Sequence, residues 1–112
     1  MERILIKVYA GLHPVDAACA DSVRLAGISA VHDSGDPWLF HERDLLHISF
    51  EGLYFPEDEV LEALDACLPA HAQGKMDVID LENWELRRYA REDGAFRLSR
   101  QGLDQVLEYS GH

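Results

Sequence analysis

The spacing of apolar residues along the chain predicts a strand followed by two well-separated helices. Residues 3–9 alternate and carry apolar side chains on both faces, which favours a central position in a sheet. In the next segment, GLHPVDAACADSVRLAG, small apolar residues recur at helical spacing, with Pro14 in the first turn and Gly27 as a left-handed end. The segment PEDEVLEALDACLP predicts the second helix, whose apolar stripe is Val60, Leu61, Leu64, Cys67 and Leu68.

Between the helices, the segment PWLFHERDLLHISFEGLYF has the alternation of a β-hairpin. The face of Ile48 is the expected core face, because the other positions of that strand are polar. A three-residue turn at 42–44 places Trp38 and Phe40 on this inner face, whereas a two-residue turn moves both aromatic residues to the face of His47. We predict the three-residue turn because it unites the aromatic residues with the core.

That register gives the hairpin an outer face made of four residues: Leu39, His41, Leu45 and His47. On this face His41 and His47 are diagonal neighbours, with backbones about 7–8 Å apart. A carboxylate such as Asp44 or Glu51 would complete a small metal site with them. The two leucines on the same face also suggest a homodimer, since twofold pairing would remove them from water.

The C-terminal third predicts a strand at residues 77–81 and then a second hairpin. Asp93 and Gly94 suit a type I′ turn between two strands, since both turn residues need a positive φ. The helix formers in ENWELRRYARE leave a helix over part of residues 84–99 as the alternative. Ser99 is expected to cap a final helix that carries Leu103, Val106, Leu107 and Tyr109.

The predicted order is therefore β-α-β-β-α-β, followed by a hairpin and a helix, within a single α+β domain of residues 1–112. This order is typical of the ferredoxin-like split βαβ fold, here with a C-terminal β-hairpin and helix as an appendage. Residues 32–37, HDSGDP, are turn formers. In an alternative arrangement, the segment GISAVHD adds a strand before the first hairpin.

Charge is the unusual feature of the composition. The chain of 112 residues has 21 acidic and 10 basic residues, a formal net charge of −11. This balance disfavours nucleic-acid backbones and anionic membrane surfaces, and it favours a basic protein partner. Residues 41–74 hold eight acidic residues and one basic residue, Arg43. The five arginines from Arg87 to Arg100 predict either a salt-bridged hairpin, which we favour, or an arginine-lined binding face.

The two cysteines, Cys19 and Cys67, fall on the apolar faces of the predicted helices and form no CxxC pattern. We interpret them as small core residues with free thiols in a reducing compartment. The N-terminus lacks the apolar h-region of a secretion signal, and no segment has the roughly 18 apolar residues of a membrane span. A cytoplasmic location without membrane contact is therefore expected.

Motifs for catalysis are absent from the sequence. It has no glycine-rich phosphate loop and no nucleophile elbow, and the six histidines show no metal-ligand spacing. Asp80 interrupts an otherwise apolar strand, which is more typical of an outward residue on an edge strand than of an acid facing a cleft. Neither an enzyme nor a cofactor is expected.

These features favour a non-catalytic protein–protein interaction or regulatory module. Its acidic region would meet a basic partner, and the neighbouring Trp38, Tyr54 and Phe55 would supply apolar anchors. The alternative function is a metal- or small-ligand-binding domain that uses the hairpin face, with His41 and His47 as the candidate ligands.

Overall fold

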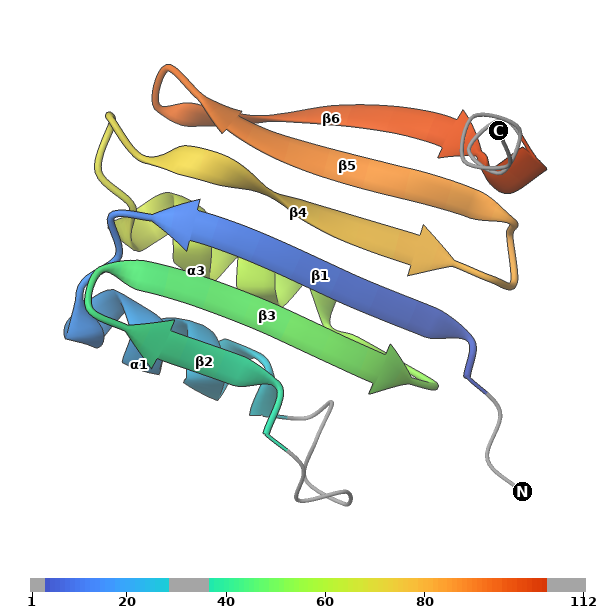
Figure 1. The fold of residues 1–112 in the computed structure, drawn as a ribbon, viewed down its shortest axis with the longest axis horizontal. Helices are drawn as coiled ribbons and strands as arrows, with labels where there is room; N and C mark the ends of the chain where they lie inside the picture. The colour runs from blue at the N-terminus through green and yellow to red at the C-terminus, as the bar shows by residue number, and fades with distance from the viewer. Residues whose placement is uncertain (1–3, 29–36, 105–112) are drawn as a thin grey trace.

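The residues that the computed structural model describes, 4–28 and 37–104, form one antiparallel sheet and two helices (Figure 1). The strands are β1 (Ile6–His13), β2 (Leu39–Glu42), β3 (Leu45–Gly52), β4 (Gln73–Asp80), β5 (Glu85–Glu92) and β6 (Ala95–Gly102). The helices are α1 (Ala17–Ala26) and α3 (Glu57–Cys67). The strand order is β2-β3-β1-β4-β5-β6, and every neighbouring pair is antiparallel. Both helices lie behind the sheet in Figure 1, and the face toward the viewer is called the open face.

This six-stranded sheet corrects the predicted fold class. The prediction of a ferredoxin-like split βαβ fold with an appended hairpin and helix is wrong, because β5 pairs with β4 over residues 85–91 and continues the same sheet. β6 then extends to Gly102, through the position where Ser99 was expected to begin a helix. The predicted helix positions that follow lie outside the described residues: Val106, Leu107 and Tyr109.

The turn between β5 and β6 explains why a strand forms here in place of a helix. Asp93 and Gly94 have φ angles of 53° and 82°, the left-handed pair that a type I′ turn needs, so the predicted hairpin is confirmed. Once this turn forms, residues 95–102 pair with β5, and the ladder satisfies their backbone groups. This pairing outweighs both the helix formers within β5 and the capping tendency of Ser99.

The core lies between the two helices and one face of the sheet. The predicted stripe of α3 is confirmed, since Val60 and Leu64 are fully buried and Leu61 and Cys67 pack against the core from partly buried positions. Three acidic residues in the first turn of α3 suit the positive end of the helix dipole. The sheet contributes alternate residues of β1, β3 and β4: Val8, Ala10, Leu12, Leu46, Ile48, Phe50, Met76 and Val78.

Local contacts define both ends of α1. At its N-terminus, the Asp16 side chain caps the helix by accepting a 2.8 Å hydrogen bond from the backbone N–H of Cys19. At its C-terminus, Gly27 has a φ of −95°, so the predicted left-handed end is wrong. The glycine serves packing instead, because a Cβ at this position would overlap the ring of Trp38.

The β2–β3 hairpin has a two-residue turn, which corrects the predicted three-residue turn. Phe40 pairs with His47, and Arg43 in the turn takes a left-handed φ of 58°. Phe40 therefore shares the open face with His47 and is 46% exposed, so its predicted place in the core is wrong. The tight turn instead directs Leu39 into the core, while Trp38, just before the strand, is still buried as predicted.

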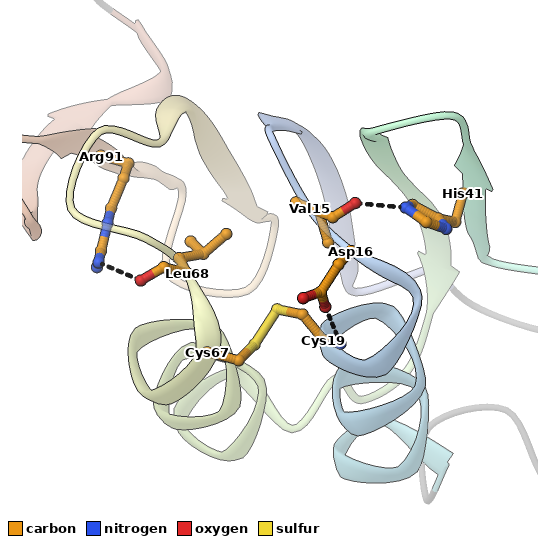
Figure 2. The surroundings of a disulfide bond; sticks show 7 residues. All are labelled: Val15, Asp16, Cys19, His41, Cys67, Leu68 and Arg91. Carbon is orange, nitrogen blue, oxygen red and sulfur yellow. Dashed lines mark hydrogen bonds between the residues drawn. A yellow bond between two sulfur atoms is a disulfide. The ribbon is translucent and has the colours of Figure 1, made fainter.

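A disulfide bond joins the two helices (Figure 2). Cys19 of α1 and Cys67 of α3 have Cα atoms 5.5 Å apart and are separated by 48 positions in the sequence. The predicted placement of both cysteines on apolar helix faces is confirmed, whereas the predicted free thiols are wrong. The two faces pack toward each other over the sheet, and no spacing rule reveals such a pairing from the sequence.

The predicted turn at 32–37 and the alternative strand in GISAVHD fall largely on residues 29–36, outside the described part of the chain. Within residues 4–28 and 37–104, neither helix has the length and apolar character needed to cross a bilayer.

Removing the disulfide is expected to lower the free energy of unfolding by roughly 2–4 kcal/mol, because the bond closes a long loop in the unfolded chain. Reduced wild-type protein and a Cys19→Ala, Cys67→Ala double variant should show similar, lower midpoints in urea denaturation. The double variant with and without reductant controls for the reductant itself. A thiol titration should first confirm that both cysteines of the reduced wild-type protein are free. A midpoint that is nevertheless unchanged would contradict the stabilising role of the bond.

Leu64→Ala is expected to cost about 2–5 kcal/mol, because this fully buried side chain leaves a cavity beneath α3 when it is truncated. Leu25→Ala is the matched control, since Leu25 of α1 is 69% exposed and its loss should cost less than about 0.5 kcal/mol. Urea denaturation of both variants measures the difference. Equal costs would show that this position of α3 does not contribute to the core.

Candidate functional site

The two hairpin histidines lie on opposite faces of the sheet. His41 faces the helices, where its Nε2–H donates a 2.6 Å hydrogen bond to the backbone carbonyl of Val15 (Figure 2). His47 is exposed on the open face, opposite Gly11 of β1. The predicted outer face that held both histidines is therefore not formed, and the two imidazoles share no site. Across the described residues, no three histidine, cysteine or carboxylate groups are arranged to hold a metal ion.

The three aromatic residues predicted as anchors also separate. Trp38 and Phe55 are buried and meet edge to face in the core, with ring centroids 5.7 Å apart. Tyr54, the neighbour of Phe55 in the sequence, is 57% exposed. Of these three residues, Tyr54 is the one that a partner can reach.

The apolar outer face expected for the first hairpin is likewise absent. Leu39 is 8% exposed and faces the helices, while Leu45 stays on the open face in a half-buried position. The more exposed side chains of this part of the open face are Tyr9, Phe40 and His47. The predicted homodimer loses the pair of leucines on which it depended.

A groove runs between α3 and the β5–β6 hairpin. Two hollows of about 470 and 460 Å³ adjoin there and share Asp58 and Tyr89, so we describe them together as the α3–hairpin groove. The first hollow contains the exposed Tyr54, and the second includes Phe96 and Leu98 of β6. The groove arises because β5 and β6 lie at one side of the sheet, beyond the strands that the two helices cover (Figure 1).

A wider hollow of about 590 Å³ opens between residues 70–74 and the hairpin end at 90–93. Its most buried charged residue, Arg91, directs its guanidinium toward Asp65 of α3. Charged and aromatic side chains converge instead in the α3–hairpin groove, which we therefore take as the candidate site.

Arg87 is the charged centre of the groove. Its guanidinium donates to Glu57 at 2.8 and 3.0 Å, to Asp80 at 3.0 Å and to Glu85 at 2.7 Å. The hydrogen bonds to Glu57 contribute most to raising the pKa of Arg87, and they outweigh its partial burial. Tyr89 donates a further hydrogen bond to Glu57, and its own pKa is raised first by burial and then by that carboxylate. One arginine thereby ties the first turn of α3 to β4 and β5.

Asp80 is fully occupied by structural hydrogen bonds. Its carboxylate accepts from the backbone N–H groups of Glu82 and Asn83, from the Asn83 side-chain amide and from Arg87. Burial alone would raise the pKa of Asp80, but the hydrogen bonds from Asn83 and Arg87 lower it overall. Asp80 ends the central strand β4 and closes the turn to β5, so its predicted edge-strand position is wrong. The carboxylate is not free to act as an acid.

A second arginine of β5 holds the other end of α3. The guanidinium of Arg91 is buried, donates to Asp65 at 2.7 Å and lies 4.9 Å from the centre of the Phe96 ring. On the open face, Arg88 binds Asp77 through two hydrogen bonds of 2.8 and 3.0 Å. These contacts confirm the predicted salt-bridged hairpin and leave three of its five arginines firmly paired.

Acidic side chains without such partners line the α3 wall of the groove. Asp58, Glu59 and Glu62 are exposed, and none of them pairs with a cation among residues 4–28 and 37–104. Glu57 and Asp65, in contrast, are held by the two arginines of β5. The groove therefore combines a negative wall on α3 with a floor that is partly apolar and that carries the exposed Arg100 of β6 in the first hollow, the one with Tyr54.

Sequence reasoning identified Tyr54 but missed Tyr89 and Leu98, which form part of the groove floor. These two residues are paired in the β5–β6 register, so both side chains lie on the same face. The turn at Asp93 and Gly94 was the available signal, because a type I′ turn determines this pairing. No comparable signal indicates that α3 lies beside them.

The fold and the groove define a small α+β protein, with a six-stranded antiparallel sheet and two helices on one face among its described residues. No family model, no curated protein and no solved structure matches the chain. A function must therefore be argued from the groove itself.

Asp80 is expected to make the protein less stable in acid. Its pKa is lower in the folded protein than in the unfolded chain, where an aspartate has a pKa of about 3.9. The stability that it contributes is therefore present above about pH 4 and is lost as the pH falls through the folded pKa. Asp80→Asn should be less stable than wild type at neutral pH and should lose less stability on acidification, as measured by urea denaturation across the acid range.

Glu82→Gln is the control for this experiment, because Glu82 is exposed and contacts Asp80 through its backbone alone. It should retain the acid dependence of the wild type. An acid dependence of Asp80→Asn equal to that of the wild type would contradict the role assigned to this carboxylate.

Proposed function

We propose that the protein is a non-catalytic protein-binding domain that engages a basic partner through the α3–hairpin groove. The observation that carries this proposal is the row formed by Asp58, Glu59 and Glu62, which is exposed and lacks cationic partners among the described residues. Neighbouring carboxylates of the same helix are held in ion pairs, so these three remain available to a ligand.

Complementary charge would bring such a partner to this surface. The formal net charge of −11 attracts a basic protein over a distance of about a Debye length, roughly 8–10 Å at physiological salt. Carboxylates along one wall of a groove would then favour one orientation of the partner over others. Tyr54, exposed at the end of the groove, supplies an amphipathic side chain of the type enriched at binding hot spots.

The ionisable groups with shifted pKa values support binding in preference to catalysis. Asp80, Arg87 and Tyr89 are engaged with one another or with Glu57, and these contacts account for the directions of their shifts. A catalytic acid or base needs a proton that it can exchange with a substrate. In this groove the groups with shifted pKa values bind each other, and the exposed carboxylates Asp58, Glu59 and Glu62 face outward.

The structure removes observations on which the predicted metal site, homodimer and cytoplasmic location were based. His41 and His47 lie on opposite faces, so we do not propose the metal or small-ligand site. The homodimer is not proposed either, because Leu39 faces the helices. The cytoplasmic location was predicted from two free thiols and from the lack of a secretion signal and of a membrane span. The Cys19–Cys67 bond removes the first of these reasons, since disulfides persist mainly in oxidising compartments.

An Asp58→Lys, Glu62→Lys double variant is expected to lose at least about fivefold of its capture of basic proteins from the native lysate at low salt. Capture by the wild type should also fall sharply when salt is raised, because exposed charges are screened. Quantitative pull-down at low and high salt measures both effects.

The matched control is Asp21→Lys, Glu42→Lys, which reverses two exposed carboxylates away from the groove. Both double variants raise the formal net charge by four, from −11 to −7. Equal losses in the two variants would show that net charge and not the groove attracts the partners. Partners that ignore both salt and the substitutions would refute the proposal.

A further inference from the structure

The helical layer of this protein covers four strands of a six-stranded sheet. α1 and α3 pack on β2, β3, β1 and β4, and β5 and β6 project beyond them (Figure 1). An α-helix with its side chains is about 10 Å wide, and neighbouring strands lie about 4.8 Å apart, so one helix covers roughly two strands. Among residues 4–28 and 37–104 no helix covers β5 and β6, so this pair offers the width of one further helix beside α3.

The floor of this position, which no described helix covers, is partly apolar. Leu98 is 47% exposed on β6, opposite Tyr89 of β5, and Leu61 of α3 borders the same hollow from the side. Phe96 completes the floor next to the buried guanidinium of Arg91. An occupant of this position would thus present apolar side chains to the sheet.

The wall of the same hollow specifies the charge of the occupant. Asp58, Glu62 and Asp65 follow one another at the i, i+4 and i+7 positions of α3 and all line it. Asp65 is already paired with Arg91, whereas Asp58 and Glu62 have no cationic partner among the described residues. The flank of the occupant that faces α3 should therefore carry lysine or arginine.

A helix fits these constraints better than an added strand. A strand paired with the outer edge of β6 would lie in the plane of the sheet and would leave Leu61 and Tyr89 uncovered. A second copy of this chain is disfavoured as the source, because the described surface of its own α3 is acidic. Like charges would then face each other across the groove.

We propose that an amphipathic helix of the basic partner lies in the α3–hairpin groove as a third member of the helical layer. This inference rests on the proposed function and adds the shape of the ligand to it. The apolar stripe of that helix packs on Leu61, Tyr89 and Leu98, and its basic flank faces Asp58 and Glu62.

The test uses a synthetic amphipathic helix of leucine and lysine as the probe, about four turns long, and its leucine–glutamate counterpart. The full chain should bind the lysine peptide and not the glutamate peptide, as measured by fluorescence anisotropy. Leu98→Thr should weaken binding by about tenfold, because a half-exposed leucine of the floor is lost while threonine suits a strand. Leu25→Gln, which removes an exposed leucine from α1, should bind within about twofold of the wild type.

Both substitutions are at exposed positions, so each variant should keep the fold, and thermal unfolding and amide NMR spectra check this. Amide shifts caused by the lysine peptide should gather on α3, β5 and β6. Equal binding by Leu98→Thr and Leu25→Gln, or shifts spread over the whole acidic surface, would overturn the inference.

Failure of this inference is distinguishable from failure of the proposed function. If Asp58→Lys, Glu62→Lys abolishes capture of natural partners while Leu98→Thr captures them as the wild type does, the domain binds basic proteins in another geometry. If the Asp58→Lys, Glu62→Lys variant captures as much as its charge-matched control, the proposed function fails and the third helix fails with it.

Discussion

Two arginines of one strand hold the hairpin against α3, and the shape of the groove depends on them. Arg87 binds the first turn of the helix through Glu57, and Arg91 binds its last turns through Asp65. Removing one partner from a buried ion pair typically costs about 3–5 kcal/mol, because the other charge is left without compensation. Arg87 has three carboxylates around it, so its desolvation is well compensated. Charge and hydrogen bonding therefore hold β5 to α3 at both ends of the helix.

The same helix uses its carboxylates for two different purposes. Glu57 and Asp65 are held in ion pairs by arginines of β5, while Asp58, Glu59 and Glu62 are exposed and have no cationic partner among the described residues. In the composition these five residues form one acidic segment. The negative charge available to a partner is smaller, because two of the five carboxylates are already paired. The arginines of β5 decide which carboxylates are used, because Arg87 reaches Glu57 and Arg91 reaches Asp65.

Sequence reasoning was most successful where a local pattern determines the structure. The stripe of α3 and the turn at Asp93 and Gly94 were both correct, since helical spacing and left-handed turn residues act over a few positions. It failed where the outcome depends on partners far along the chain. Ser99 has the local signature of a helix cap, but its pairing with Arg88 of β5 places it in a strand. The groove likewise depends on α3 and β5 lying side by side, although they are distant in the sequence. The turn of the first hairpin is one residue shorter than predicted. This difference places His41 and Phe40 on the faces opposite to those predicted.

β6 is the last strand of the sheet, and within the described residues its outer backbone groups meet no further strand. An exposed strand margin of this kind is a template for uncontrolled polymerisation unless side chains discourage it. Arg97 and Arg100 place positive charge on the two opposite faces of β6. If the β6 strands of two molecules paired edge to edge, these arginines would come close to their counterparts and repel them. The protein can thus keep this flank of its sheet accessible beside the groove while resisting assembly into fibres.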